Sequence, residues 1–247
     1  MRTANYIFGL LLLCVLPNAM AGETSNLLNT AWEAFWQQTG FPRAAYKWQT
    51  PIVVKFGGDD VGRHKEFALK QLRTAAEQAG VSVTEAEGDG ANANVQVEFF
   101  GPNNPNTLPP NEPCVTNINW RKFAIVDGRI RAKTESLWRC MLHESMHLMG
   151  VPGHPMYNTI LSYFARGSSL TSADKLLLAT IYHKDLPSGA SPFLVLQSMG
   201  RRLAEGNEGA REEADTFLRK IIRDMEEFGH DRGEAPTVIV QIGRAHV

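Results

Sequence analysis

The sequence predicts an α+β fold, in which a mixed sheet is followed by helices and helical segments are added at both ends of the chain. Two patterns indicate this class. Short runs rich in β-branched residues are typical of strands, and longer stretches with apolar residues every three or four positions are typical of amphipathic helices. The two patterns alternate up to residue 132, and the rest of the chain is helical. With 247 residues, the chain can form one good-sized domain with a helical appendage.

The strand pattern occurs in three segments in the first half of the chain: Pro51–Phe56, Val81–Thr84 and Val95–Phe100. Two further strand-like segments, 123–126 and 129–132, flank Asp127 and Gly128. Because Asp-Gly readily adopts the positive φ angles of a tight turn, this arrangement predicts a β-hairpin. The stretch 101–113 is rich in proline and asparagine and is predicted to be a loop.

Helical spacing occurs in five segments: Leu27–Gln38, Lys65–Ala79, Glu135–Met149, a segment beginning at Thr171, and Gly209–Phe228. We expect Thr134 to cap the start of the third helix and Gly150 to end it. A stretch rich in proline, glycine and serine, Leu186–Pro192, precedes the final helical region. The apolar stripe of the last helix is interpreted as a face docked on the main domain, with a partner-binding helix as the alternative.

Residues 1–21 are predicted to be a secretory signal peptide. Arg2 supplies a positive start, Ile7–Leu16 is a short apolar run, and Ala19-Met20-Ala21 fits a cleavage site. The run is short for a membrane span, so an uncleaved anchor is the less favoured alternative. We therefore expect a mature chain that begins near Gly22 and is secreted or periplasmic, in a bacterial envelope, without stable membrane insertion.

The last six residues, Ile242–Val247, resemble the translation of a sequencing adapter and are interpreted as foreign to the protein. The expected organisation is then a signal peptide at 1–21, a main domain at 22–186, a helical extension at 187–241, and the foreign residues at 242–247. The formal net charge is −1 at pH 7, which argues against nucleic acid or an anionic membrane as a partner.

Two cysteines, Cys114 and Cys140, remain after the predicted cleavage. In an oxidising compartment such a pair most simply forms a disulfide, which would connect the region around Cys114 to the helix at 135–149. Cys140 also lies three residues before His143 and therefore on the same face of that helix. A thiolate that binds a metal is the alternative role for Cys140.

The segment His143-Glu144-Ser145-Met146-His147 has the pattern H-E-x-x-H within a predicted helix. The i, i+4 spacing places both imidazoles on one face, about one turn apart, so that two nitrogens can bind one metal ion. Glu144 is offset around the helix and can act on a water molecule at that metal. The pattern therefore predicts a hydrolytic zinc site.

A third protein ligand is expected shortly after this helix, because catalytic zinc sites keep three protein ligands and one open position. Gly150 permits a sharp turn three residues after His147, and His154 follows it with Gly153 before it. We predict His154 as the third ligand. Asp174 is the second choice and His183 a more distant one.

This run, HESMHLMGVPGHP, resembles the long motif of the metzincins, H-E-x-x-H-x-x-G-x-x-H, with the third histidine one residue later. Metzincins of the astacin and serralysin kind also carry a turn of the form S-x-M-x-Y, and here the matching residues are T-I-L-S-Y at 159–163. Leu161 stands at the methionine position, where a hydrophobic residue packs beneath the metal. The resemblance implies that Tyr163 helps to stabilise the oxyanion, and an ordinary packed tyrosine is the alternative.

The resemblance implies a metzincin-like catalytic domain with a twisted mixed sheet and an active-site helix, and it covers the order of elements from 51 to 182. It also implies a secreted zinc endopeptidase acting on proteins or peptides. In that mechanism Glu144 takes a proton from the zinc-bound water and passes it to the leaving amine. The chain is also similar to a bacterial family of secreted proteins described as zinc-dependent proteases.

Two alternatives remain open. The first is a non-catalytic, zinc-stabilised binding or scaffold domain of the cell envelope, in which Cys140 closes the fourth coordination position. The presence of Glu144 argues against this, since a structural zinc site does not need it. The second is a different hydrolase fold with H-E-x-x-H, whose third ligand is a distant acidic residue, and the short step from Gly150 to His154 argues against that.

Overall fold

The structure is a computed structural model that describes residues 16–36, 44–88, 92–105, 108–109, 111–156, 159–162, 169–205 and 208–232. Contacts along the chain group it into two compact units. The larger unit is Asn29–Met199, and the smaller unit combines Met1–Leu28 with Gly200–Val247. The expected step from main domain to extension, between residues 186 and 187, thus lies inside the larger unit.

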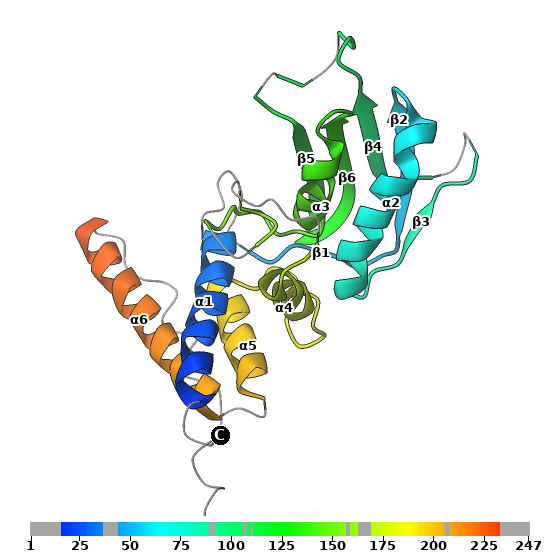
Figure 1. Ribbon diagram of the computed structural model, residues 1–247. Coiled ribbons are helices and arrows are strands. Elements are labelled where there is room, and N and C mark those ends of the chain that lie inside the picture. Colours follow the sequence, from blue (N-terminus) through cyan, green and yellow to red (C-terminus); the bar gives the residue numbers. More distant parts are fainter. Residues whose placement is uncertain are drawn as a thin grey trace, which may run out of the picture. The chain divides into compact units, whose positions relative to one another are not determined.

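The larger unit contains a six-stranded mixed sheet (Figure 1). Its strands are β1 (Lys47–Trp48), β2 (Ile52–Gly58), β3 (Val83–Glu85), β4 (Val95–Phe100), β5 (Cys114–Arg121) and β6 (Ala124–Lys133). Strands β3, β2, β4 and β6 run parallel in this order, and β1 pairs in parallel with the start of β6. Strand β5 pairs with β6 in the antiparallel direction. Mixed sheet and helices together confirm the predicted α+β class.

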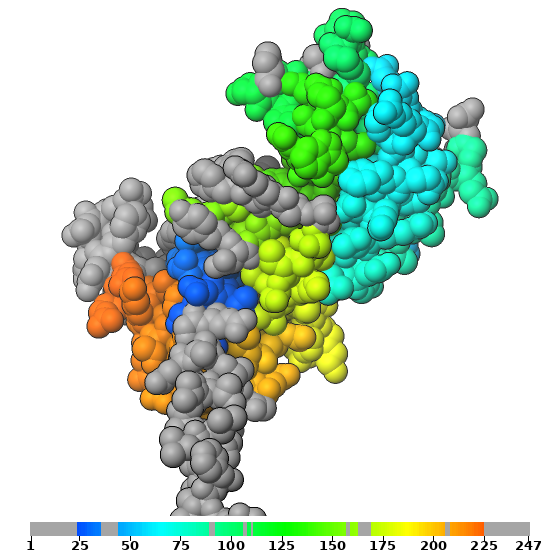
Figure 2. All heavy atoms as spheres, viewed as in Figure 1, coloured from blue at the N-terminus to red at the C-terminus, as the bar shows by residue number. Residues whose placement is uncertain are grey.

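The described residues form six helices: α1 (Leu16–Trp36), α2 (Val61–Gln78), α3 (Leu137–Leu148), α4 (Ser172–Ile181), α5 (Pro192–Ala204) and α6 (Glu208–Arg232). Helix α2 makes the crossover between β2 and β3 that a parallel pair requires. Helices α2 and α3 contact each other and the sheet. In the space-filling view the cyan surface of α2 adjoins the green surface of α3 without a gap (Figure 2).

The core of the larger unit lies between the sheet and these two helices. Its side chains are apolar and almost inaccessible to solvent: Val54, Val97, Phe99 and Ile130 from the sheet, Ala68, Leu72 and Ala75 from α2, and Met141, Met146 and Leu148 from α3. Gly128 on β6 makes the close approach of α3 possible, because a Cβ at this position would lie 2.4 Å from Leu148 Cδ1. The motif helix is therefore held against the middle of the sheet.

The predicted hairpin at Asp127-Gly128 is wrong, since β6 runs through both residues without a turn. The tight turn lies instead at Lys122 and Phe123, between β5 and β6, and both residues have positive φ, 49° and 64°. Phe123 is held there by packing, with its ring centroid 5.7 Å from that of Tyr46. The glycine of the Asp-Gly pair serves helix packing, which the turn signal does not distinguish.

Several helix and strand ends also differ from the sequence predictions. Helix α3 begins after Ser136, not after Thr134, and Ser136 makes no side-chain capping bond. Gly150 ends α3 as predicted, with φ 83°. Helix α4 has a capping box between Thr171 and Asp174, in which each side chain accepts a hydrogen bond from the other residue's backbone. Elements β1, β5 and α5 were not predicted.

In the smaller unit, α1 contacts α6 through a polar pair and α5 contacts α6 through small residues. Ser25 on α1 donates to Glu213 Oε1 from its backbone N at 3.0 Å and from its hydroxyl at 2.5 Å. A Cβ at Gly200 would lie 3.1 Å from the Ala214 Cβ, so the two helices touch there. Along the predicted apolar stripe of α6, Ala214 and Ile221 are buried, as expected for a docked helix.

The predicted cleavage point between Ala21 and Gly22 falls inside α1, which begins at Leu16. Residues 1–15 and 242–247 lie outside the described residues, so the signal peptide and the foreign C-terminal residues stay predictions. Within the part of the chain that the structure describes, no helix combines the length and the apolar character needed to cross a membrane.

Candidate metal centre

Three histidine side chains converge on one point at the end of α3. His143 and His147 lie on the same face of the helix, and their Nε2 atoms are 3.0 Å apart. His154 comes from the segment after the helix, and its Nε2 lies 3.1 Å from that of His147 and 3.2 Å from that of His143. Among the described residues, these three form the one group of His, Cys, Asp or Glu side chains placed to hold a metal ion.

The chain reverses direction at Gly150 to bring in the third histidine. Gly150 has φ 83°, and a Cβ there would lie 2.2 Å from the Tyr46 carbonyl oxygen, so only glycine fits. Two backbone hydrogen bonds close the turn, from Gly150 N to His147 O at 2.9 Å and from Val151 N to Met146 O at 3.2 Å. This reversal is the local reason that the histidine triad forms.

The segment that carries His154 rests on α1, within the larger unit. Gly153 N donates to the Ala34 carbonyl at 2.8 Å, and Met156 N donates to Glu33 Oε2 at 3.0 Å. A Cβ at Gly153 would lie 2.4 Å from the Ala34 carbonyl oxygen. The segment therefore passes close to the backbone of α1, and the extra residue before His154 is accommodated in this contact.

The two histidines of α3 have defined tautomers. His143 Nδ1 lies 3.0 Å from the Ile160 carbonyl oxygen, and His147 Nδ1 lies 2.7 Å from the Val151 carbonyl oxygen. A carbonyl oxygen only accepts hydrogen bonds, so each Nδ1 carries the proton. In the neutral ring each Nε2 then presents a bare lone pair to the centre of the triad.

Burial keeps these rings neutral. It lowers the pKa of His143 to about 4 and the pKa of His147 to about 3, and in both cases the neighbouring imidazoles lower it further. Burial also lowers the pKa of the half-buried His154. At neutral pH the rings of the triad are therefore in the form that binds a metal ion.

The triad fits a zinc ion. Zinc lies about 2.0–2.1 Å from imidazole nitrogens in tetrahedral sites, which separates those nitrogens by about 3.3 Å. The three observed separations are 3.0 to 3.2 Å. Two bare lone pairs at 3.0 Å repel each other unless a cation lies between them, so the donor set and its geometry both favour a bound cation.

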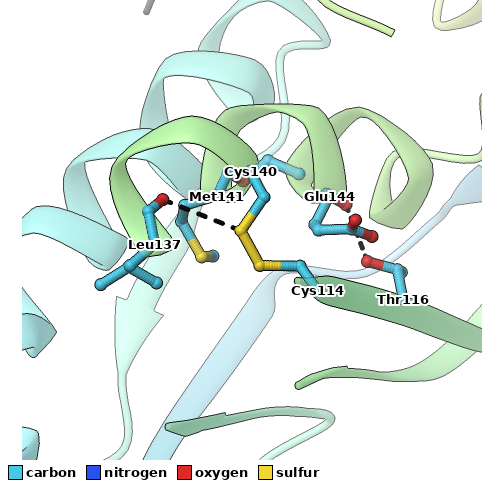
Figure 3. Close-up of a disulfide and its surroundings, with 7 residues drawn as sticks. Cys114, Thr116, Leu137, Cys140, Met141 and Glu144 are labelled. Carbon is cyan, nitrogen blue, oxygen red and sulfur yellow. Dashed lines mark hydrogen bonds between the residues drawn. A yellow bond between two sulfur atoms is a disulfide. The ribbon is translucent and has the colours of Figure 1, made fainter. Parts of the chain in front are cut away.

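Glu144 follows His143 on α3 and is buried, with 6% of its surface exposed. Loss of hydration raises the pKa of its carboxyl to about 7, and the Thr116 side chain opposes part of that rise. The Thr116 hydroxyl donates to the Glu144 backbone carbonyl at 3.1 Å, so β5 is attached to the helix at this residue (Figure 3). A carboxyl group thus lies next to the triad in sequence without belonging to it.

A disulfide joins Cys114 on β5 to Cys140 on α3, with Cα atoms 6.1 Å apart (Figure 3). The pairing agrees with the sequence expectation, and the alternative of a Cys140 thiolate ligand is wrong because this sulfur is bonded to Cys114. The disulfide lies two residues before Thr116 along β5 and four residues before Glu144 along α3. Two successive links therefore fix the edge strand to the motif helix.

The turn expected to match the metzincin methionine turn lies beside His143. Residues 159–162 are buried, and Leu161 is completely inaccessible. Asp174 does not act as a ligand, contrary to its role as the second choice. Its carboxylate accepts hydrogen bonds from this turn and from Thr171, and it is fully buried away from solvent. Tyr163 lies outside the described residues.

Two residues at the end of α3 were missed by the sequence analysis. Trp48 Nε1 donates to the Leu148 carbonyl at 2.8 Å, and the Tyr182 hydroxyl donates to the Met149 carbonyl at 3.1 Å. These bonds satisfy helix-end carbonyls that α3 leaves unpaired. Burial raises the pKa of Tyr182, so it stays a neutral donor. The distant choice for a ligand, His183, pairs with Asp185 at 3.4 Å and is not in the triad.

The sequence was compared with protein-family models and with curated proteins, and neither comparison finds a match.

Replacing Gly153 with alanine should displace His154, because the added methyl group would overlap the Ala34 carbonyl. We expect zinc binding to weaken and the free energy of unfolding to fall by about 1–3 kcal/mol, the usual effect of overpacking. Gly62→Ala on α2 is the matched control, since nothing lies within 4 Å of its added methyl group. Zinc titration and thermal unfolding measure both effects. Wild-type zinc affinity in Gly153→Ala would show that the α1 contact does not position the third histidine.

Removing the disulfide with the double substitution Cys114→Ala and Cys140→Ala should destabilise the protein. The two cysteines are 26 residues apart, and releasing a loop of this size lowers the free energy of unfolding by about 3–4 kcal/mol. Denaturant unfolding measures the loss, and reduced wild-type protein should show the same loss as the double variant. Equal stability of the oxidised wild type and the double variant would contradict a stabilising role.

Proposed function

We propose that this protein is a secreted or periplasmic zinc-dependent endopeptidase of the metzincin type. One observation carries the proposal: the Nε2 atoms of His143, His147 and His154 converge to within 3.2 Å of one another, with a buried glutamate at the next position to His143. Three neutral nitrogens at one point favour a divalent cation such as zinc. The added glutamate favours a hydrolytic site over a structural one.

His143, His147 and His154 would hold the zinc ion through their Nε2 atoms. When bound, zinc supplies Lewis-acid chemistry, lowering the pKa of a water molecule towards neutrality and polarising a substrate carbonyl. Because all three ligands are neutral, they leave the full positive charge available for this purpose. Three protein ligands also leave a coordination position for water and substrate.

Glu144 acts as the general base and then as the general acid. Its carboxylate accepts a proton from the attacking water and later donates a proton to the amine that leaves. The Thr116 hydroxyl and the adjacent disulfide hold β5 against α3 at this residue, which supports a fixed position for the carboxylate. Tyr163 directly follows the buried turn next to His143, and in this proposal its hydroxyl stabilises the oxyanion.

The proposed substrate is a protein or peptide, and nucleic acid is not a proposed partner because the net charge is −1. The disulfide is compatible with an oxidising compartment outside the cytoplasm. The order strand, long helix, strands and motif helix, here β2, α2, β4 to β6 and α3, supports the metzincin resemblance.

The non-catalytic alternative loses its main support. A closed structural zinc site needs a fourth protein ligand, and Cys140 was the residue that could provide it. Its sulfur is bonded to Cys114. Nothing else among the described residues joins the three histidines as a fourth ligand of the metal group.

Replacing Glu144 with glutamine tests the catalytic role. We expect zinc content to be unchanged, because Glu144 is not a ligand, and hydrolysis of an unfolded protein such as casein to fall by about 10²–10⁴-fold. The exposed Glu135, which lies just before α3, provides the control substitution Glu135→Gln, and this variant should cleave normally. Casein cleavage by Glu144→Gln at the wild-type rate, or none by the zinc-loaded wild type, would contradict the proposal.

A further inference from the structure

Asp174 is a buried carboxylate with two separate sets of hydrogen-bond donors. Its Oδ2 atom accepts from Ile160 N at 3.0 Å, and from the backbone N and hydroxyl of Thr171, both at 2.8 Å. These bonds form the capping box of α4 and attach the turn at 159–162 to the helix. Its Oδ1 atom accepts from the Thr159 hydroxyl alone among the donors described.

The Thr159 hydroxyl continues the connection to the next peptide group. It donates to Asp174 Oδ1 and accepts from Leu161 N at 3.1 Å. Leu161 N belongs to the same peptide group as the Ile160 carbonyl, and that carbonyl oxygen accepts from His143 Nδ1 at 3.0 Å. The atoms therefore form one unbroken series: carboxylate, hydroxyl, peptide group, imidazole.

We propose that Asp174 and Thr159, through the Ile160–Leu161 peptide group, form a hydrogen-bond relay that orients and polarises His143 as a metal ligand. Both are positioning residues, because neither touches the metal site. The proposal rests on the proposed function only in requiring that the triad binds zinc. It assigns to a buried acidic residue, which the sequence suggested as a ligand, a role one step behind the ligand.

The direction of every bond in the series supports polarisation. Each donor faces the carboxylate end, so the negative charge on Asp174 polarises the hydroxyl, then the peptide dipole, and so strengthens the Ile160 carbonyl as an acceptor. A stronger acceptor at Nδ1–H makes the opposite nitrogen of the ring a better electron donor to a metal ion. A carboxylate behind a ligating histidine has this effect directly, and here the peptide group transmits it.

His147 provides an internal comparison. Its Nδ1 donates to the Val151 carbonyl at 2.7 Å, which belongs to the turn that ends α3. Asp174 is not among the partners of that turn, since its carboxylate bonds only Thr159, Ile160 and Thr171 among the described residues. The relay is therefore specific to His143, and breaking it should affect one ligand of the three.

Thr159→Val is the variant that cuts the relay at one point. It removes the hydroxyl and keeps the shape of the side chain, and the bonds from Asp174 Oδ2 to Ile160 and Thr171 can remain. Thr159→Ser keeps the hydroxyl and should restore the relay. Thr180→Val is the matched control, because Thr180 is another fully buried threonine of this region, whose hydroxyl donates to Leu176 O at 2.7 Å within α4.

Two measurements on the full-length chain distinguish relay from simple packing. Competition with a chromophoric chelator gives the zinc affinity, which we expect to fall by about 10- to 100-fold in Thr159→Val and to stay near wild type in Thr159→Ser and Thr180→Val. NMR of the Co²⁺-substituted protein shows the ring N–H protons of the ligands. In Thr159→Val one of these signals should shift, and the others should keep their positions.

Unchanged zinc affinity and unchanged ring N–H signals in Thr159→Val would overturn the relay. So would an equal shift of all the ring signals, or equal losses in Thr159→Val and Thr180→Val, since either result indicates general loosening. If Thr159→Val does not fold, Asp174→Asn decides by the same two measurements, because it removes the charge and keeps the shape.

The relay and the proposed function fail in different ways. A wild-type protein that binds no zinc would end both. A wild-type protein that binds zinc and cleaves casein, with Thr159→Val indistinguishable from it, would end the relay alone. Loss of affinity in Thr159→Val with no casein cleavage by the wild type would support the relay and contradict the peptidase.

Discussion

Two unprotonated imidazole nitrogens, His143 Nε2 and His147 Nε2, face each other at 3.0 Å, and this is the interaction on which the rest of the site depends. Their protonation follows from the other side of each ring, where Nδ1 donates to a backbone carbonyl. The pair is unfavourable in isolation and becomes favourable with a cation between the rings. The fold therefore has to place two carbonyl groups correctly, those of Val151 and Ile160.

Each carbonyl is placed by a different part of the structure. The Val151 carbonyl is local, because the left-handed turn at Gly150 brings it back onto α3. The Ile160 carbonyl depends on a buried turn that Asp174 ties to the start of α4. Helix α3 itself is fixed to the sheet through the close approach at Gly128 and to β5 through the disulfide. The ligands thus lie on a rigid helix, which suits a preorganised metal site.

The sequence predicted best what is local. The spacing of His143 and His147 and the stop at Gly150 depend on residues within one or two turns of helix, so their arrangement followed from helical geometry. The late position of His154 depends on Gly153 docking against Ala34, a contact between segments far apart in the chain. No local pattern reveals such a contact. Asp174 was considered as a ligand because carboxylates bind metals, but its hydrogen-bond donors come from a turn whose position the sequence does not show.

The same limit explains the errors in the sheet. Asp127-Gly128 has the composition of a turn, yet the glycine is needed for contact with Leu148, and the chain turns at Lys122 and Phe123, where tertiary packing holds two non-glycine residues at positive φ. Strand β5 was missed because its exposed face carries Asn117 and Asn119, which are unfavourable in strands. The partner strand β6 overrides this local preference.

The metal centre is tested most directly by the zinc content of purified wild-type protein beside His154→Ala and His183→Ala. His183 lies outside the triad and pairs with Asp185, so its loss is the matched control. We predict about one zinc per chain in the wild type and in His183→Ala, and loss or strong weakening of zinc binding in His154→Ala. Zinc that is absent from the wild type, or bound equally well by His154→Ala, would contradict a centre built from His143, His147 and His154.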